Sequence, residues 1–153
     1  MNNEKSICAL NTLIAINNER IGFYEITSKE TYESDLITIF FEFQERSHKC
    51  IHELTKEIQK LGGIPIKTPK KKSILYDFWI DFKTSIVNKE REEILSTCEY
   101  DDYLVCKTYG TILEDNFHSL NTDLRNKLMA QELLIKADHD KVKGLSDMLL
   151  KSI

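Results

Sequence analysis

The sequence predicts an all-α protein in which four long amphipathic helices form an antiparallel bundle with one long crossover. Apolar residues recur at three- and four-residue steps over four segments, about 3–29, 35–61, 89–114 and 122–151, as in helices that bury one face. Only five glycines and two prolines interrupt the chain, which favours long helices over a fold with many turns. A length of 153 residues suits one hydrophobic core, so we expect residues 1–153 to form a single domain.

The first two helices are predicted from their apolar stripes and from the signals at their ends. The stripes are Ile7, Leu10, Ile14, Asn17, Ile21 and Tyr24 in the first helix, and Leu36, Phe40, Phe43, Ser47, Cys50 or Ile51, Leu54, Ile58 and Leu61 in the second. Ser34 or Asp35 can cap the start of the second helix. The pair Gly62-Gly63 permits the left-handed turn that ends it.

The last two helices show the same pattern. Their stripes are Ile94, Cys98, Asp101, Val105, Thr108 and Ile112 in the third helix, and Leu124, Leu128, Gln131, Ile135, Asp138, Val142, Leu145 and Leu149 in the fourth. Asn88 is the predicted cap of the third helix, and glutamates in its first turn lie where the helix dipole favours negative charge. Asn121, Thr122 or Asp123 can cap the fourth helix.

The lengths of the connections predict how the helices run. About five residues join the first two helices and about seven join the last two, so each pair must be antiparallel. About 27 residues separate the second helix from the third, which is enough to return along the bundle and make these two helices parallel. Pro65 and Pro69 oppose helix at the start of this link, and the run Lys70–Lys72 is interpreted as a solvated loop. A short crossover helix is predicted after Ser73 from Leu75, Phe78, Trp79, Phe82 and Ile86.

Composition excludes several classes of function. A net charge of −4 gives no general attraction for nucleic acid or anionic lipid, and no apolar run approaches the roughly 20 residues that cross a bilayer. The N-terminal residues lack a basic start and a small-residue cleavage site, so we expect a cytoplasmic protein. Four cysteines without a close pair, Cys8, Cys50, Cys98 and Cys106, are interpreted as reduced thiols of the core.

Polar residues interrupt all four stripes near the middle of the helices. The interruptions are Asn17, then Ser47 with His48, then Asp101 or Asp102, then Asp138 with His139. The midpoints of antiparallel helices lie at about the same height, so these groups are predicted to form one polar layer between apolar ones. Buried carboxylates and imidazoles cost several kcal/mol unless they are paired, hydrogen-bonded or bound to metal. The layer therefore predicts a hydrogen-bonded network or a binding site.

A metal site is one interpretation of this layer. Glu45-x-x-His48 is the pair that lets a carboxylate and an imidazole of one helix share a metal in a bundle, and His52 follows one turn later. The third helix offers Glu99-x-x-Asp102. The predicted metal ligands are Glu45, His48, Glu99, Asp102 and His139. Solvated surface residues, or hydrogen bonds in the core, are the alternative explanation for Glu45 and His48.

The crossover topology, the polar layer and Glu45-x-x-His48 together resemble the ferritin-like superfamily. More narrowly, the chain resembles a family of small bacterial four-helix-bundle proteins of unknown function. The features that carry this resemblance are Leu61-Gly62-Gly63-x-Pro65, Trp79-x-Asp81-x-Lys83, Ile94-Leu95-x-x-Cys98-Glu99-x-x-Asp102, Tyr109 and His139-Asp140-Lys141-Val142.

The resemblance implies a ferritin-like fold, and in the di-iron members a Glu on the first and third helices and an E-x-x-H pair on the second and fourth. Here Asn17 stands where the first Glu is expected, and Lys136 stands three residues before His139. A site for two cations needs the negative charge that these positions lack. We therefore predict no working di-iron centre.

Two functions remain from the sequence. The first is a non-catalytic ferritin-like protein with a structural, stress-associated or interaction role, without a cofactor, in which Asn17, His48, Asp102 and Asp138 form a network that fixes helix register. A homodimer is its expected assembly. The second is a metal-binding protein that holds one iron, zinc or manganese ion in the bundle core. Neither hypothesis assigns catalytic residues.

Overall fold

The computed structural model describes residues 3–67 and 90–151. All regular secondary structure within these two ranges is α-helix. The helices are α1 (Asn3–Lys29), α2 (Ser34–Lys60), α4 (Arg91–Asp115) and α5 (Thr122–Lys151). Each lies within two residues of its predicted bounds. The all-α prediction with four long helices is confirmed for the described part of the chain. The predicted crossover helix and the lysine run Lys70–Lys72 lie outside the described residues.

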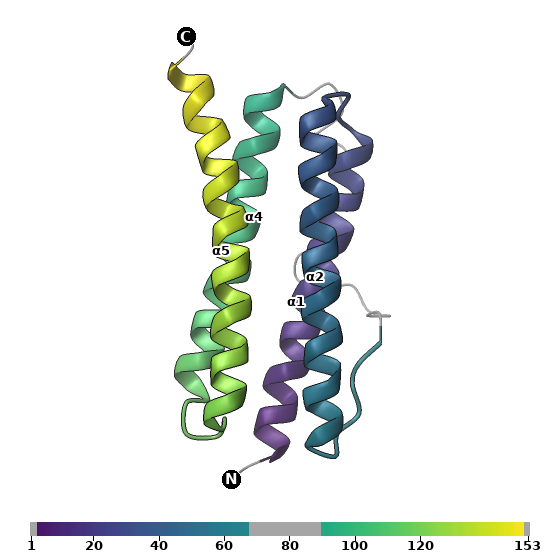
Figure 1. The fold of residues 1–153 in the computed structure, drawn as a ribbon, viewed down its shortest axis with the longest axis vertical. Helices are drawn as coiled ribbons and strands as arrows, with labels where there is room; N and C mark the ends of the chain where they lie inside the picture. The colour runs from purple at the N-terminus through teal and green to yellow at the C-terminus, as the bar shows by residue number, and fades with distance from the viewer. Residues whose placement is uncertain (1–2, 68–89, 152–153) are drawn as a thin grey trace.

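The four helices lie side by side along one long axis (Figure 1). Helix α1 packs mainly on α2 and α4 mainly on α5, and smaller contacts join α1 to α4 and α2 to α5. Figure 1 shows α1 and α5 rising through the view while α2 and α4 descend. The four pairs of helices that share the main contacts are therefore antiparallel, and α2 and α4 run in the same direction.

Charged contacts connect the ends of α2 and α4. Arg91, at the start of α4, binds Asp35 with Nη2 to Oδ2 at 2.8 Å and Glu33 with Nη1 to Oε2 at 3.0 Å. Hydrogen bonding to Arg91 lowers the pKa of Asp35. The three side chains are partly exposed, so this cluster aligns the two helix starts but adds little stability.

The helix ends agree only in part with the predicted caps. Gly62 has a φ of 80° and ends α2 as predicted, and Asn121 caps α5 by accepting from the Leu124 N–H at 2.9 Å. The cap predicted for α2, Ser34 or Asp35, is wrong, because Glu33 precedes the helix and makes no side-chain cap. Glu90 precedes α4, also without a side-chain cap, and the predicted cap Asn88 lies outside the described residues.

Two apolar clusters fill the bundle, with polar side chains between them. One contains Leu10, Leu13, Ile14, Leu54, Ile58, Val105, Tyr109, Leu128 and Ile135 among others. The other contains Phe23, Tyr24, Phe40, Phe43, Ile94, Leu95, Cys98 and Val142 among others. Along each helix, buried polar residues stand between the members of one cluster and those of the other. This arrangement divides the core into two apolar halves.

The cysteines differ from the sequence prediction at one end of the chain. Cys50 and Cys98 are buried and Cys106 is half-buried, but Cys8 is exposed. The prediction of a core thiol is therefore wrong for Cys8. It lies beside the apolar stripe of α1 rather than within it, since its neighbours Ala9 and Leu10 are the residues that α1 buries there.

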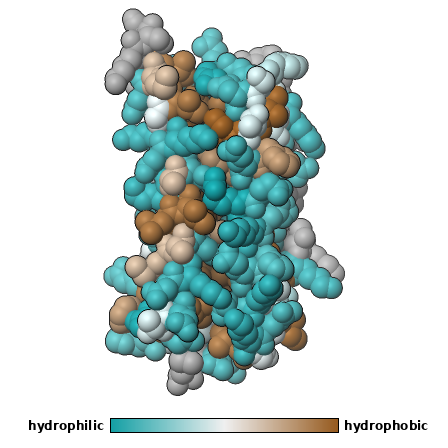
Figure 2. Space-filling view, in the orientation of Figure 1, coloured by the Kyte–Doolittle hydropathy of each residue, from teal (hydrophilic) through white to brown (hydrophobic). Residues whose placement is uncertain are grey.

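The face seen in Figure 2 is mainly hydrophilic, with apolar side chains gathered in a few places, one of them on the outer side of α5. The exposed apolar side chains of this helix include Met129, Leu133 and Leu134. Among the described residues, every helix is too polar or too short in its apolar runs to cross a membrane.

Candidate functional site

The middle of the bundle contains a layer of buried polar side chains. Asn17, Ser47, Asp101, Asp102 and Asp138 are all at most 3% exposed. They come from all four described helices. Burying these polar groups costs free energy unless each polar atom has a hydrogen-bond partner. The contacts of each side chain therefore determine whether the layer is stable.

Arg20 lies at the centre of this layer and is completely buried. Its Nε donates to Asp102 Oδ1 at 2.8 Å, and its Nη2 donates to Asp138 Oδ2 at 2.9 Å. Its Nη1 donates to Ser47 Oγ at 3.0 Å and to the Phe43 carbonyl at 3.1 Å. One guanidinium of α1 therefore binds all three other helices, using the planar set of donors that arginine provides.

The two carboxylates that Arg20 binds accept further hydrogen bonds from other side chains. The Tyr24 hydroxyl donates to Asp102 Oδ2 at 2.8 Å, and Arg46 Nε donates to Asp138 Oδ2 at 2.8 Å. The Tyr24 ring also packs on the guanidinium of Arg20, with 5.2 Å between its centroid and Cζ. Two arginines thus face two carboxylates, which gives the network a balanced charge.

A second, uncharged network also connects the four helices. Asn17 Nδ2 of α1 donates to the Tyr109 hydroxyl of α4 at 2.9 Å. Tyr109 donates to Gln131 Oε1 of α5 at 2.7 Å, and Gln131 Nε2 donates to the Cys50 carbonyl of α2 at 3.3 Å. This network, which we call the Tyr109 network, supports the arginine-centred one with neutral hydrogen bonds.

The environment keeps the central arginine charged. Burial lowers the pKa of Arg20, but Asp102, Tyr24 and Asp138 together raise it well above its usual range. Burial raises the pKa of Asp102, and Arg20 and Tyr24 oppose this by stabilising the carboxylate. The result is a buried ion pair, whose attraction offsets the desolvation of its charges only when the geometry and remaining hydrogen bonds are good.

Asn17 Oδ1 is buried without a hydrogen-bond partner, and among the carboxylates of the layer Asp101 is the exception. It is 2% exposed, and its Oδ2 has no hydrogen-bond partner. Burial, and then the neighbouring Asp102, raise the pKa of Asp101 well above the usual value. A raised pKa favours the neutral acid, which leaves the charge balance of the arginine-centred network undisturbed.

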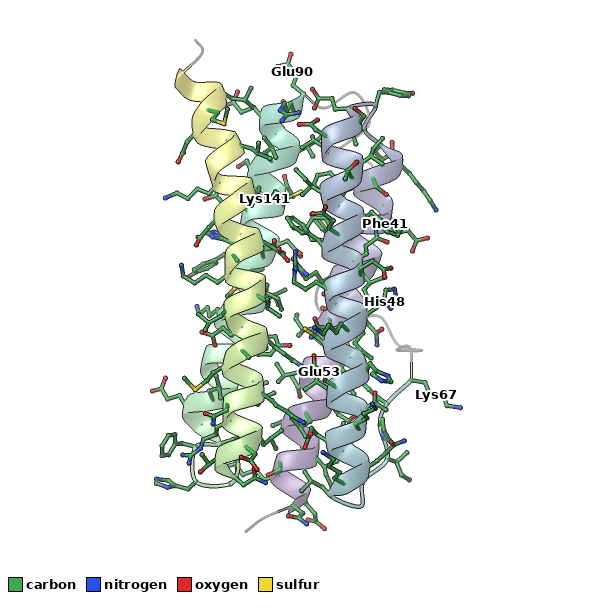
Figure 3. The ribbon with its side chains drawn as sticks, in the orientation of Figure 1. Phe41, His48, Glu53, Lys67, Glu90 and Lys141 are labelled. Carbon is green, nitrogen blue, oxygen red and sulfur yellow. The ribbon has the colours of Figure 1, made fainter. Side chains whose placement is uncertain are left out.

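The residues predicted as metal ligands lie in three different places. Glu45 and His48 are exposed on α2, and Asp102 is buried against Arg20. Figure 3 shows His48 on the side of α2 that faces away from α5. Glu99 and His139 face each other between α4 and α5, with Oε1 and Nε2 3.9 Å apart. The structure therefore does not bring the five together around one point.

The polar layer does not fit the two-metal centre that the ferritin-like resemblance implies. The carboxylates at its middle, Asp102 and Asp138, already bind the Arg20 guanidinium, whose positive charge would repel a metal ion. Asn17 donates its amide to Tyr109, and Lys136 is exposed and paired with Asp140. In the described ranges 3–67 and 90–151, no group of three or more His, Cys, Asp or Glu side chains is arranged to hold a metal ion.

Sequence reasoning missed the central residue of the site. The stripe of α1 was assigned through Ile21, whereas the helix buries Arg20 together with Leu13 and Phe23 and leaves Ile7 and Ile21 half-buried. Two signals point to Arg20 in hindsight. It lies one turn after Asn17 and one turn before Tyr24, and a core layer with several acids needs a cation.

Comparison with known proteins places the chain in a family. No curated protein is significantly similar to it. A family described as "Domain of unknown function (DUF2383)" matches residues 5–115, a range that takes in most of α1, all of α2 and all of α4. This agrees with the resemblance to a four-helix family of unknown function. Because the match covers well over half of the sequence, the chain belongs to the DUF2383 family.

Proposed function

We propose that this protein is a non-catalytic, ferritin-like bundle in which a buried arginine takes the place of a metal centre. Its role is then structural or stress-associated and is exerted through contacts with other proteins. The observation that carries the proposal is the position of Arg20, which binds Asp102 and Asp138 with neither carboxylate more than 3% exposed.

The helix directions support the ferritin-like part of the proposal. Helices α2 and α4 run in the same direction and do not follow each other closely in the chain (Figure 1). A bundle of this kind needs one long crossover, which is the connection of ferritin-like folds.

The chemistry of the layer supports the non-catalytic part. A metal-dependent oxidation needs carboxylates that are free to bind the ion, and here Asp102 and Asp138 are bound by arginines. The Tyr109 hydroxyl is used between Asn17 and Gln131. Both networks instead fix the rotation and height of each helix, since a shift of one helix would leave several buried polar atoms without partners.

Self-association is a further part of the proposal. The outer side of α5 exposes Leu133 by 65% and Met129 by 52%, and apolar side chains that gather on a surface often mark a contact with another protein. We propose a homodimer as the assembly. Light scattering over a range of protein concentrations tests this part, and a monomer at the highest concentration would contradict it.

The metal content of the purified protein tests the main proposal. We expect protein purified without chelators, and without a histidine tag, to contain no stoichiometric iron or manganese, and to consume no oxygen when Fe(II) is added. One equivalent of iron or manganese that is lost in Asp102→Asn would contradict the proposal. The variant Glu45→Gln, on the exposed face of α2, is the matched control, since it leaves the buried layer intact.

A further inference from the structure

We propose that His48 and His52 form a surface site for a divalent transition-metal ion of the zinc, copper or nickel class. Both side chains are exposed on α2, and Figure 3 shows His48 on the side away from α5. This site lies outside the polar layer, and it is independent of the proposed function of the core.

The spacing of the two histidines suits one metal ion. Residues four apart on a helix are neighbours on its surface, with about 5–6 Å between their Cβ atoms. Two imidazoles at this spacing can bind the same ion, as they do in helical H-E-x-x-H sites. Imidazole nitrogens bind zinc at about 2.0–2.1 Å, a distance that the two rings reach by rotation about their side-chain bonds.

Helix α2 holds the pair in place. It runs from Ser34 to Lys60, so both histidines lie well inside it, where the backbone does not fray. Folding has already ordered the backbone that bears the two histidines. Metal binding therefore does not bear the entropy cost of ordering it.

Neither imidazole has another role in the described part of the chain. His48 and His52 make no hydrogen bond, ion pair or ring contact there. The other two histidines differ: His139 lies 3.3 Å from Asp140 Oδ1, and His118 contacts the Phe117 ring. Among the described residues, no side chain therefore competes with a ligand for the rings of His48 and His52.

The charges around the pair allow a cation to bind. Glu45 lies one turn before His48 and is exposed, so it adds negative charge to this face. Lys49 and Lys56 are also near, but both are exposed on long, flexible side chains that can extend away from the ion. Water completes the coordination, as at metal sites with few protein ligands.

The class of metal follows from the ligands. Imidazole nitrogen suits zinc, copper and nickel, whereas magnesium and calcium prefer oxygen ligands. The free imidazole must be unprotonated to bind, so the affinity for the metal should fall in acid.

Isothermal titration of the untagged protein with Zn²⁺ at neutral pH tests the proposal. We expect one Zn²⁺ per chain, and an affinity that falls by at least about tenfold in His48→Ala and equally in His52→Ala. The matched control is His118→Ala, which removes an exposed histidine that has no second histidine one turn away, and which should bind as the wild type does.

The outcomes separate this site from the core. No heat above that of dilution, or binding that survives both His48→Ala and His52→Ala, overturns the surface site. Binding that is lost in Asp102→Asn but kept in the two histidine variants overturns both this proposal and the arginine-centred core. Unchanged circular dichroism of the histidine variants shows that they fold, as expected for exposed positions.

Discussion

Arg20 and Asp102, on α1 and α4, form an ion pair in which neither side chain is exposed to solvent, with Nε and Oδ1 2.8 Å apart. A buried pair of this kind is weak support for stability in itself, because removing both charges from water is costly. It is sensitive to the loss of one partner, since the other charge is then left buried and alone.

Arg20→Met should destabilise the fold strongly. It leaves Asp102 and Asp138 without the cation that binds both, and the loss of one partner of a buried pair costs about 3–5 kcal/mol. Urea denaturation followed by circular dichroism measures the change. Arg46→Met is the matched control, because Arg46 binds Asp138 from a position that is 31% exposed and its removal should cost much less. Equal effects of the two variants would contradict the central position of Arg20.

Replacing Arg20 together with the buried acids and the tyrosine that it binds should restore much of this loss. In Arg20→Met combined with Tyr24→Phe, Asp102→Leu and Asp138→Leu, no buried charge of the central pair remains. Apolar replacement of a complete buried ion network is often neutral or stabilising, by about 1–4 kcal/mol. The same denaturation experiment should therefore find the combined variant more stable than Arg20→Met alone. A combined variant that is less stable would show that the network itself stabilises the fold.

Stability should depend on pH through Asp101. Because the pKa of Asp101 is raised in the folded state by burial and then by Asp102, the unfolded chain loses this proton first as the pH rises. Stability from this group is thus fully present below the ordinary aspartate pKa of about 4 and falls as the pH rises toward the folded-state value. Asp101→Asn should remove this fall and be more stable than the wild type at neutral pH.

Denaturation curves at several pH values check this prediction. The variant and the wild type should differ least in acid and most at neutral pH. A variant that is less stable than the wild type at neutral pH would show that the Asp101 carboxylate is ionised and has a favourable partner.

The cysteines should differ sharply in reactivity. Burial raises the pKa of Cys50 and of Cys106 to about 11, and it raises that of Cys98 well above the usual value. Since the thiolate is the reactive form, only the exposed Cys8 should react rapidly with a thiol reagent at neutral pH. The native protein should show one fast thiol, which Cys8→Ser removes, and the others should react when the chain is unfolded. Several fast thiols in Cys8→Ser would contradict the buried positions.

The fold could be predicted from the sequence because it depends on periodicity. Apolar residues such as Phe40, Phe43 and Leu54 recur at helical spacing, and this pattern determines which face of a helix is buried. The caps were harder to predict, since Glu33 and Glu90 precede their helices without a side-chain cap. Tertiary contacts, such as Arg91 with Asp35, fix those ends instead.

The site could be predicted only in outline. Polar residues in the stripes, such as Asn17 and Asp138, indicated a buried layer, but the partners depend on side chains from other helices. The sequence pattern did not indicate Arg20, because a charged residue next to the apolar Ile21 is expected on the solvent-facing side of the helix. His48 was placed toward the core because it follows Ser47, but one residue changes the direction of a side chain by about 100° around a helix. That rotation points His48 outward.

Hydrogen exchange at the Nε–H of Arg20, followed by NMR, tests the buried guanidinium most directly. We expect this proton to exchange only when the bundle unfolds, because it is bound to Asp102 inside a fully buried side chain. The Nε–H of Arg125, on the partly exposed surface of α5, is the internal reference and should exchange rapidly. If Arg20 exchanges as fast as Arg125, its side chain is in contact with solvent and the arginine-centred core is contradicted.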